Sequence, residues 1–169
     1  MIDVAVQIER PWPLSQEWEA LARRAVLAAL RSSPWAELES EAVCAEVSVK
    51  YADDEEVQAL NAAYRQKDKP TNVLSFPMVP RDLLDAIADT DDGEVLLGDI
   101  ILAHGVCARE AAEKGVDVAI HATHLIVHGM FHLLGFDHID DAEAEAMEAL
   151  ERAALATLGI ADPYAVEEA

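Results

Sequence analysis

The chain has 169 residues, of which 52% are hydrophobic, and a formal net charge of −21 from 33 acidic and 12 basic side chains. This length and apolar content predict a single domain over residues 1–169 and exclude an intrinsically disordered chain. Since no apolar run reaches the ~18 residues of a membrane span and the start lacks the basic-then-apolar pattern of a secretion signal, we expect a cytoplasmic protein with no membrane partner.

The first half of the chain predicts strands with apolar residues at alternate positions and helices with apolar residues every three to four positions. The turn residues Asp, Lys and Pro near residue 70 predict a connection between a helix and a strand. In chain order, we expect a strand at 2–9, a helix at 15–31, a strand at 43–51, a helix from its N-cap Asp53 to Tyr64, and a strand at 72–76.

The second half predicts one more strand followed by three helices. In chain order, we expect a loop or short helical turn at 81–94, a strand at 95–102, and helices at 103–114, 117–134 and 140–158. The many acids of the last helix are expected to form a solvated face. The sequence therefore predicts an α+β fold, with one small mixed sheet of about four strands packed with about five helices.

The two cysteines are far apart and form no C-x-x-C motif. Cys44 falls in an expected strand and Cys107 in an expected helix. We expect both to be reduced thiols rather than a disulfide or metal ligands.

Three histidines with metal-ligand spacing are the most informative feature of the sequence. His128 and His132 are four residues apart, so they lie on one face of a helix. Gly135 can adopt the left-handed conformation that ends a helix and returns His138 to the same point. Three neutral imidazoles suit one Zn²⁺ ion and leave a fourth position for water, as in a catalytic site.

The same spacing occurs in zincin metalloproteases, which carry a Glu directly after the first His as general base. Here that residue is Gly129, which argues against a protease. The alternative to a metal site is a set of core histidines bonded to backbone carbonyls. His121, His124, His128 and His132 follow intervals of 3, 4 and 4 residues and so form one polar stripe on the expected helix. Of these, His121 and His124 are expected to be structural or to support the ligands.

A basic segment between the second helix and the third strand is the second candidate site. Arg65, Lys67 and Lys69 place three of the twelve basic residues within five positions. The guanidinium of Arg65 is suited to bind a phosphate or a developing oxyanion, and the lysines to bind substrate. The alternative is an exposed basic turn in which Arg65 pairs with Asp68.

Together, three segments of the sequence resemble the bacterial YbeY family. They are Asn61-x-x-Tyr-Arg65-x-Lys67-Asp68-x-Pro-Thr-Asn-Val-Leu-Ser-Phe76, then Leu97-Gly-Asp-Ile100, then His128-Gly-x-x-His132-Leu-Leu-Gly135-Phe-Asp137-His138. The resemblance covers the chain from about Val43 to Ala153. The aromatic before Asp137 is Phe136, where family members often have Tyr.

The resemblance implies a fold of the zincin type, in which a metal helix packs beneath a small mixed sheet. It also implies a zinc-dependent endoribonuclease for single-stranded RNA, associated with 3′-end maturation of 16S ribosomal RNA and with ribosome quality control. His128, His132 and His138 match the zinc ligands, and Arg65 matches the basic residue beside the metal. A ribosomal particle or ribosome-associated protein is an expected partner, and DNA is not.

Several roles remain open from sequence. Asp137 is expected to orient an imidazole or to act as a base, and Asp99 to be structural, capping or bonding the helix that carries the histidines. The attacking group is either metal-activated water or the RNA 2′-hydroxyl. Two other functions are compatible with the motifs: a zinc hydrolase of a peptide or small phosphoester, and a non-catalytic ribosome-assembly factor whose metal is structural. Because the net charge opposes binding to phosphates, we expect weak, salt-sensitive binding to RNA alone.

Overall fold

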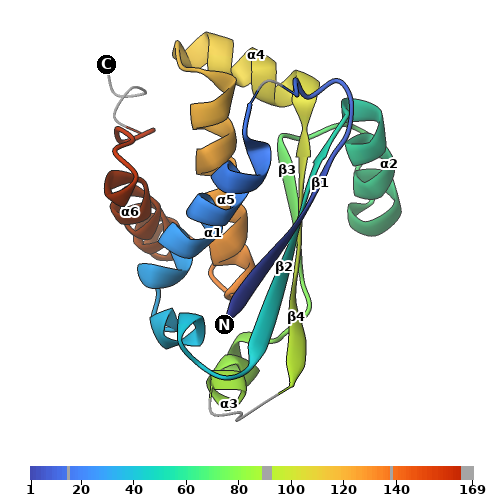
Figure 1. Cartoon of the computed structure of the whole chain (residues 1–169). Coiled ribbons are helices and arrows are strands. Elements are labelled where there is room, and N and C mark those ends of the chain that lie inside the picture. The colour runs from blue at the N-terminus through green and yellow to red at the C-terminus, as the bar shows by residue number, and fades with distance from the viewer. Residues whose placement is uncertain (15, 89–92, 138, 165–169) are drawn as a thin grey trace.

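The computed structural model describes residues 1–14, 16–88, 93–137 and 139–164. A four-stranded sheet forms its centre (Figure 1). The strands are β1 (Ile2–Ile8), β2 (Cys44–Ala52), β3 (Val73–Pro77) and β4 (Glu94–Ala103). The helices are α1 (Trp18–Arg31), α2 (Asp54–Arg65), α3 (Leu84–Ala88), α4 (His104–Lys114), α5 (Val118–Leu133) and α6 (Asp141–Thr157), with short 3₁₀ turns at Ala36–Glu39 and Arg81–Leu83.

The strand order in the sheet is β1-β2-β4-β3. The pairs β1–β2 and β2–β4 are parallel, whereas β3 runs antiparallel to β4 with Val73 opposite Leu102. The sheet is therefore mixed, as the sequence predicts. Because β3 is an edge strand, the chain that leads into it from α2 lies at the rim of the sheet.

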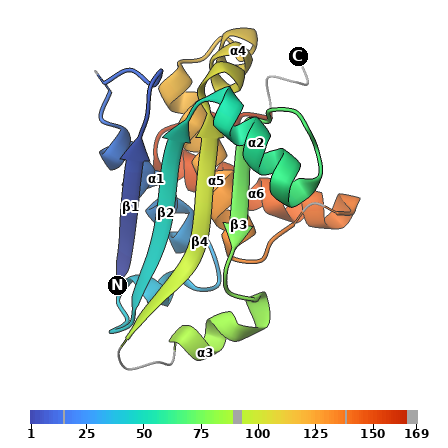
Figure 2. The same ribbon diagram turned by 90° about the vertical axis from the view of Figure 1, so that its right-hand side faces the viewer.

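The helices are divided between the two faces of the sheet. α1, α5 and α6 lie on one face and α2 on the other, as two perpendicular views show (Figures 1 and 2). The strand side chains alternate accordingly: Ile100 and Leu102 belong to the larger core, whereas Ile101 and Ala103 pack with Val57 of α2. This arrangement places α5, the histidine helix, directly against β4 and the edge strand β3.

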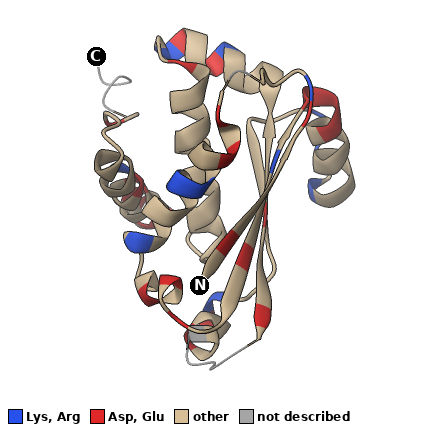
Figure 3. Ribbon diagram, in the orientation of Figure 1, with Lys and Arg blue, Asp and Glu red and all other residues tan. Residues whose placement is uncertain are grey.

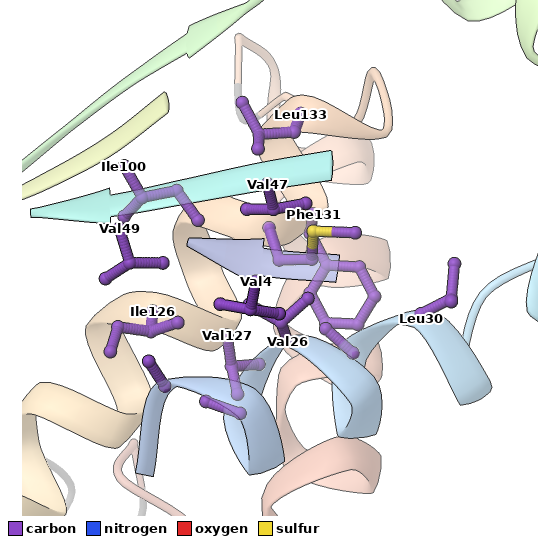
Figure 4. Close-up of a cluster of buried hydrophobic side chains, with 14 of the residues drawn as sticks. Val4, Val26, Leu30, Val47, Val49, Ile100, Ile126, Val127, Phe131 and Leu133 are labelled. Atoms are coloured by element: carbon purple, nitrogen blue, oxygen red, sulfur yellow. The ribbon is translucent and has the colours of Figure 1, made fainter. Parts of the chain in front are cut away.

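Apolar side chains of α1, α5 and the sheet form the larger core (Figure 4). Val47 and Val49 of β2 and Ile126 and Phe131 of α5 are fully buried there. A helix that is apolar on nearly all sides is expected to be buried, and most of the side chains of α5 are. The position of α5 is therefore fixed by packing against the sheet on one side and against α1 on the other.

The predicted α+β class, the four strands and the five long helices are confirmed. The first long helix begins at Trp18 rather than at residue 15, and the predicted loop after β3 contains the short helix α3. Cys44 and Cys107 lie in β2 and α4 as expected, and neither forms a disulfide. Among the described residues, no helix has the length and apolarity of a membrane span.

Candidate active site

Helix α5 ends in a glycine-stabilised turn, as its sequence predicts. Gly135 has a φ of 91°, in the left-handed region. The backbone N–H of Gly135 donates to the carbonyl of His132, and that of Phe136 to the carbonyl of Phe131. The rings of Phe131 and Phe136 also pack edge to face, 5.8 Å apart. These bonds and the apolar contact define a Schellman motif, which turns the chain back towards the last turn of α5.

His128 and His132 face each other on one side of α5, where both are partly buried. Their Nε2 atoms are 3.0 Å apart. Two nitrogens bound to a tetrahedral zinc ion at ~2.05 Å would be about 3.3 Å apart, so this separation fits a shared metal ion. His138, the third predicted ligand, lies outside the described residues. Within the described part of the chain, no three His, Cys, Asp or Glu side chains converge as a metal site.

Gly129, the residue that replaces the protease glutamate, faces the sheet. A Cβ atom at this position would be 3.0 Å from Cγ2 of Ile100 and 3.3 Å from its Cγ1. Such distances are tighter than ordinary van der Waals contacts. The glycine therefore allows α5 to approach β4 closely, and a longer side chain would begin against the core rather than beside the imidazoles.

Glu151 of α6 is a buried carboxylate beside the histidines, and sequence analysis missed it. Its exposed fraction is 1%. Oε2 is 3.2 Å from Nδ1 of His128, and Oε1 is 2.8 Å from Nε2 of His124. Burial disfavours its ionised form, but the hydrogen bonds to His124 and His128 outweigh burial and lower the pKa of Glu151 to about 2. The expectation that the acids of α6 form only a solvated face is therefore wrong for Glu151.

The spacing of α6 contained a signal for this carboxylate. Met147, Glu151, Ala154 and Leu155 are its buried residues, at i, i+4, i+7 and i+8. Glu151 therefore occupies an apolar-face position of an amphipathic helix. A charged residue at such a position requires a partner, and the partner lies on α5.

The other two histidines of α5 are buried and have carboxylate partners. His124 shares Glu151 with His128, and Nε2 of His121 lies 2.8 Å from Oε1 of Glu110 on α4. Burial lowers the pKa of His121, although Glu110 opposes this shift. Both rings therefore connect the histidine helix to neighbouring helices.

The basic segment meets the histidine helix at a shared cavity of about 430 Å³. Arg65, Lys67 and Lys69 line it together with His128. Nη2 of Arg65 donates to the carbonyl of Ser75 at 2.7 Å, and its guanidinium lies 5.5 Å from the centre of the Phe76 ring. Asp68, the alternative partner considered for Arg65, instead accepts a bond from Gln58.

Asn61 shapes the loop that carries these cations, a role that sequence analysis did not assign. It is buried, with 3% of its surface exposed. Its side-chain amide donates to the carbonyl of Lys69 at 2.9 Å, and its own carbonyl accepts from the N–H of Lys67. Acidic residues are distributed over strands and helices (Figure 3). Against this acidic background, Arg65, Lys67 and Lys69 form a local basic rim at the cavity.

The two remaining candidates lie apart from this cavity's lining. Asp137 is exposed in the turn after Gly135. Asp99 lines a separate cavity of about 360 Å³ with Tyr64, Phe76 and Met78. That cavity adjoins the α2 side of the sheet, so the expectation that Asp99 bonds the histidine helix is wrong: β-strand alternation directs it to the opposite face.

Comparisons with known proteins point to one family. The model of the family described as Endoribonuclease YbeY matches residues 7–159. A protein of that name from Rhizorhabdus wittichii is 67% identical over 99% of both chains. Another from Sphingopyxis alaskensis is 56% identical over 99% of this chain and all of the relative.

The fold also has a structural counterpart at low sequence identity. The solution structure of TM1509 from Thermotoga maritima superposes with a TM-score of 0.53 at 19% identity, covering 94% of this chain and 92% of that one. The family match, the high identities and the shared cavity of Arg65 and His128 lead to one conclusion: the chain belongs to the YbeY family of endoribonucleases.

Proposed function

We propose that this endoribonuclease is zinc-dependent, cuts single-stranded RNA, and acts in 3′-end maturation of 16S ribosomal RNA and in ribosome quality control. The single observation that carries the proposal is the cavity in which Arg65, Lys67 and Lys69 lie with His128. It combines cations for phosphate oxygens with an imidazole of the expected metal motif. We further propose that residues 1–169 form one domain and that the enzyme works in the cytoplasm, where ribosomes are made.

The chemistry of the donor set supports a single zinc ion. His128, His132 and His138 would hold it through neutral imidazoles, which are common zinc ligands. When bound, zinc supplies a Lewis acid that can polarise a phosphoryl group or lower the pKa of water. The 3.0 Å separation of the His128 and His132 Nε2 atoms supports this assignment.

The protein side chains would bind and orient the RNA. Arg65 is held by the Ser75 carbonyl and by the Phe76 ring, so its remaining N–H donors can bind non-bridging phosphate oxygens with little loss of side-chain freedom. Lys67 and Lys69 would bind neighbouring phosphates. Asp137 would orient the adjacent His138 by accepting a hydrogen bond.

A partner is proposed because the chain's charge opposes RNA binding. A net charge of −21 repels a polyanion at long range, whereas the basic rim acts only near contact. We propose that a ribosomal particle or a ribosome-associated protein presents the RNA to this cavity.

The test combines metal analysis with RNA cleavage. Purified protein is assayed for zinc and for cleavage of a single-stranded RNA before chelation, after chelation and after zinc is restored. His128→Ala should lose zinc and cleavage. Arg65→Ala should keep zinc and its melting temperature but lose cleavage by about 10²-fold or more, as expected for a lost transition-state contact. Arg23→Ala, an exposed arginine on α1, is the matched control.

Three outcomes would overturn the proposal. Cleavage of a peptide with intact RNA would indicate a zinc hydrolase of another substrate. Unchanged cleavage after chelation, with loss of stability instead, would indicate a structural metal. Full zinc content in His128→Ala would refute the ligand assignment.

A further inference from the structure

Glu151 is a buried anion whose described contacts are imidazoles and a phenol rather than a lysine or arginine. Oε1 is 2.8 Å from His124 Nε2 and accepts a bond from the Tyr164 hydroxyl at 2.8 Å, while Oε2 is 3.2 Å from His128 Nδ1. A buried carboxylate is strongly destabilising unless its oxygens are satisfied. Residues from α5, α6 and the C-terminal segment are therefore tied together at one point.

The chemistry of a carboxylate fixes the proton positions on both rings. An ionised carboxylate only accepts hydrogen bonds, so the imidazole nitrogen that faces each oxygen must carry a proton. His128 is then protonated on Nδ1, and its Nε2 lone pair points towards Nε2 of His132, 3.0 Å away. This tautomer is the one in which Nε2 can bind a metal ion.

Tyr164 holds the carboxylate from the other side and is itself held in place. Its N–H donates to Asp162 Oδ1 at 2.9 Å, and Arg152 Nε donates to Asp162 Oδ2 at 3.0 Å. The Arg152 guanidinium lies 5.4 Å from the centre of the Tyr164 ring. The segment after α6 is thus anchored so that the tyrosine hydroxyl reaches Oε1 of Glu151.

We propose that Glu151 is a positioning residue that locks His128 in the Nδ1–H tautomer and in the orientation needed to bind the metal, and that Tyr164 fixes Glu151 in turn. The inference rests on the proposed function for the metal ion, whereas the tautomer of His128 does not depend on that function. Carboxylates that accept a bond from the outer nitrogen of a ligating histidine change metal affinity by about 10- to 100-fold. Glu151 would act through His128 and would not contact the RNA.

Two readouts test this role. The first is ¹⁵N NMR of the imidazoles in metal-free protein near pH 8, where His128 should be the Nδ1–H tautomer. The second is zinc affinity by competition with a chelator. Glu151→Gln should weaken zinc binding by about 10- to 100-fold and mix the His128 tautomers. Tyr164→Phe should weaken binding by less than about tenfold. Glu145→Gln, an exposed glutamate on α6, should match the wild type in both readouts.

The outcomes are separable from those of the proposed function. An Nε2–H tautomer of His128 in the wild type overturns the inference whether or not the protein binds zinc or cuts RNA. Folded Glu151→Gln with wild-type zinc affinity and unchanged imidazole signals also overturns it. If Glu151→Gln does not fold, Tyr164→Phe decides: weaker zinc binding at a wild-type melting temperature supports the inference, and unchanged binding refutes it.

Discussion

Gly129 provides a direct test of how closely the histidine helix packs on the sheet. A glycine inside a helix costs about 1 kcal/mol relative to alanine, so Gly129→Ala should stabilise the protein by that amount if space were available. The new Cβ would instead be 3.0 Å from Ile100 Cγ2, and overpacking of this kind costs about 1–3 kcal/mol. The two effects together predict a net loss of about 0–2 kcal/mol.

A double-mutant cycle isolates the clash. Ile100→Ala removes the three atoms of Ile100 that a Cβ at residue 129 would meet, so Gly129→Ala should stabilise that background by about 1 kcal/mol. The coupling free energy should then be about 1–3 kcal/mol. Urea unfolding followed by the fluorescence of the buried Trp12, Trp18 and Trp35 measures each corner of the cycle. A stabilising Gly129→Ala in the wild-type background would refute the reasoning.

The same geometry predicts that a protease-like glutamate cannot simply be restored. Gly129→Glu adds the clash with Ile100 and places a carboxylate at the sheet, where an unpaired charge costs several kcal/mol. Because whole domains are stable by about 5–15 kcal/mol, a cost of this size should remove a large part of the stability and lower the urea midpoint markedly. Ile120→Glu, which places the same side chain at a position of α5 that is 39% exposed, is the control and should fold.

Two further predictions concern the cations and the thiols. Replacing Lys67 and Lys69 by Ala should reduce the slope of log K against log salt by about 1.4, where K is the binding constant for single-stranded RNA, since each phosphate contact contributes about 0.7. Fluorescence anisotropy at several salt concentrations measures this slope, and Arg109→Ala on α4 is the control. An unchanged slope would remove both lysines from the binding site. Burial raises the pKa of the Cys107 thiol to about 12, so at most one thiol should react with a disulfide reagent in the native protein at pH 8 and both in urea. Rapid reaction of two thiols without urea would contradict the burial of Cys107.

Local sequence patterns were sufficient to predict the secondary structure and the end of the histidine helix. The glycine at residue 135 favours this turn because φ is 91° there, and a Cβ at the position would also lie 2.6 Å from Cβ of Arg81. Alternation in β2 and β4 predicted strands because each has side chains in two separate cores. The short helix α3 was predicted only as one of two alternatives, a loop or a short helical turn at 81–94, because five residues contain too little of a helical period to distinguish them.

The contacts of the site depend on tertiary packing and were only partly accessible. Glu151 follows His128 by 23 residues, and no local pattern indicates which element packs against the apolar face of α6. The spacing of Met147 and Leu155 around it marked a core position, but not its partner. Similarly, the sequence placed Arg65 beside the metal only through family resemblance, whereas its shared cavity with His128 follows from the packing of α5 against β3 and β4.

The charge distribution explains how so acidic a chain can act on RNA. Exposed charges more than about 8 Å apart are largely screened at physiological salt, so the acids on distant helices oppose approach but have little effect inside the cavity. There, the cations of the Asn61-anchored loop lie beside His128, and their attraction is felt only once a phosphate has entered. An enzyme of this kind gains little affinity from long-range attraction and depends on contact geometry. We therefore expect RNA presented by another surface to reach the site more readily than RNA in dilute solution.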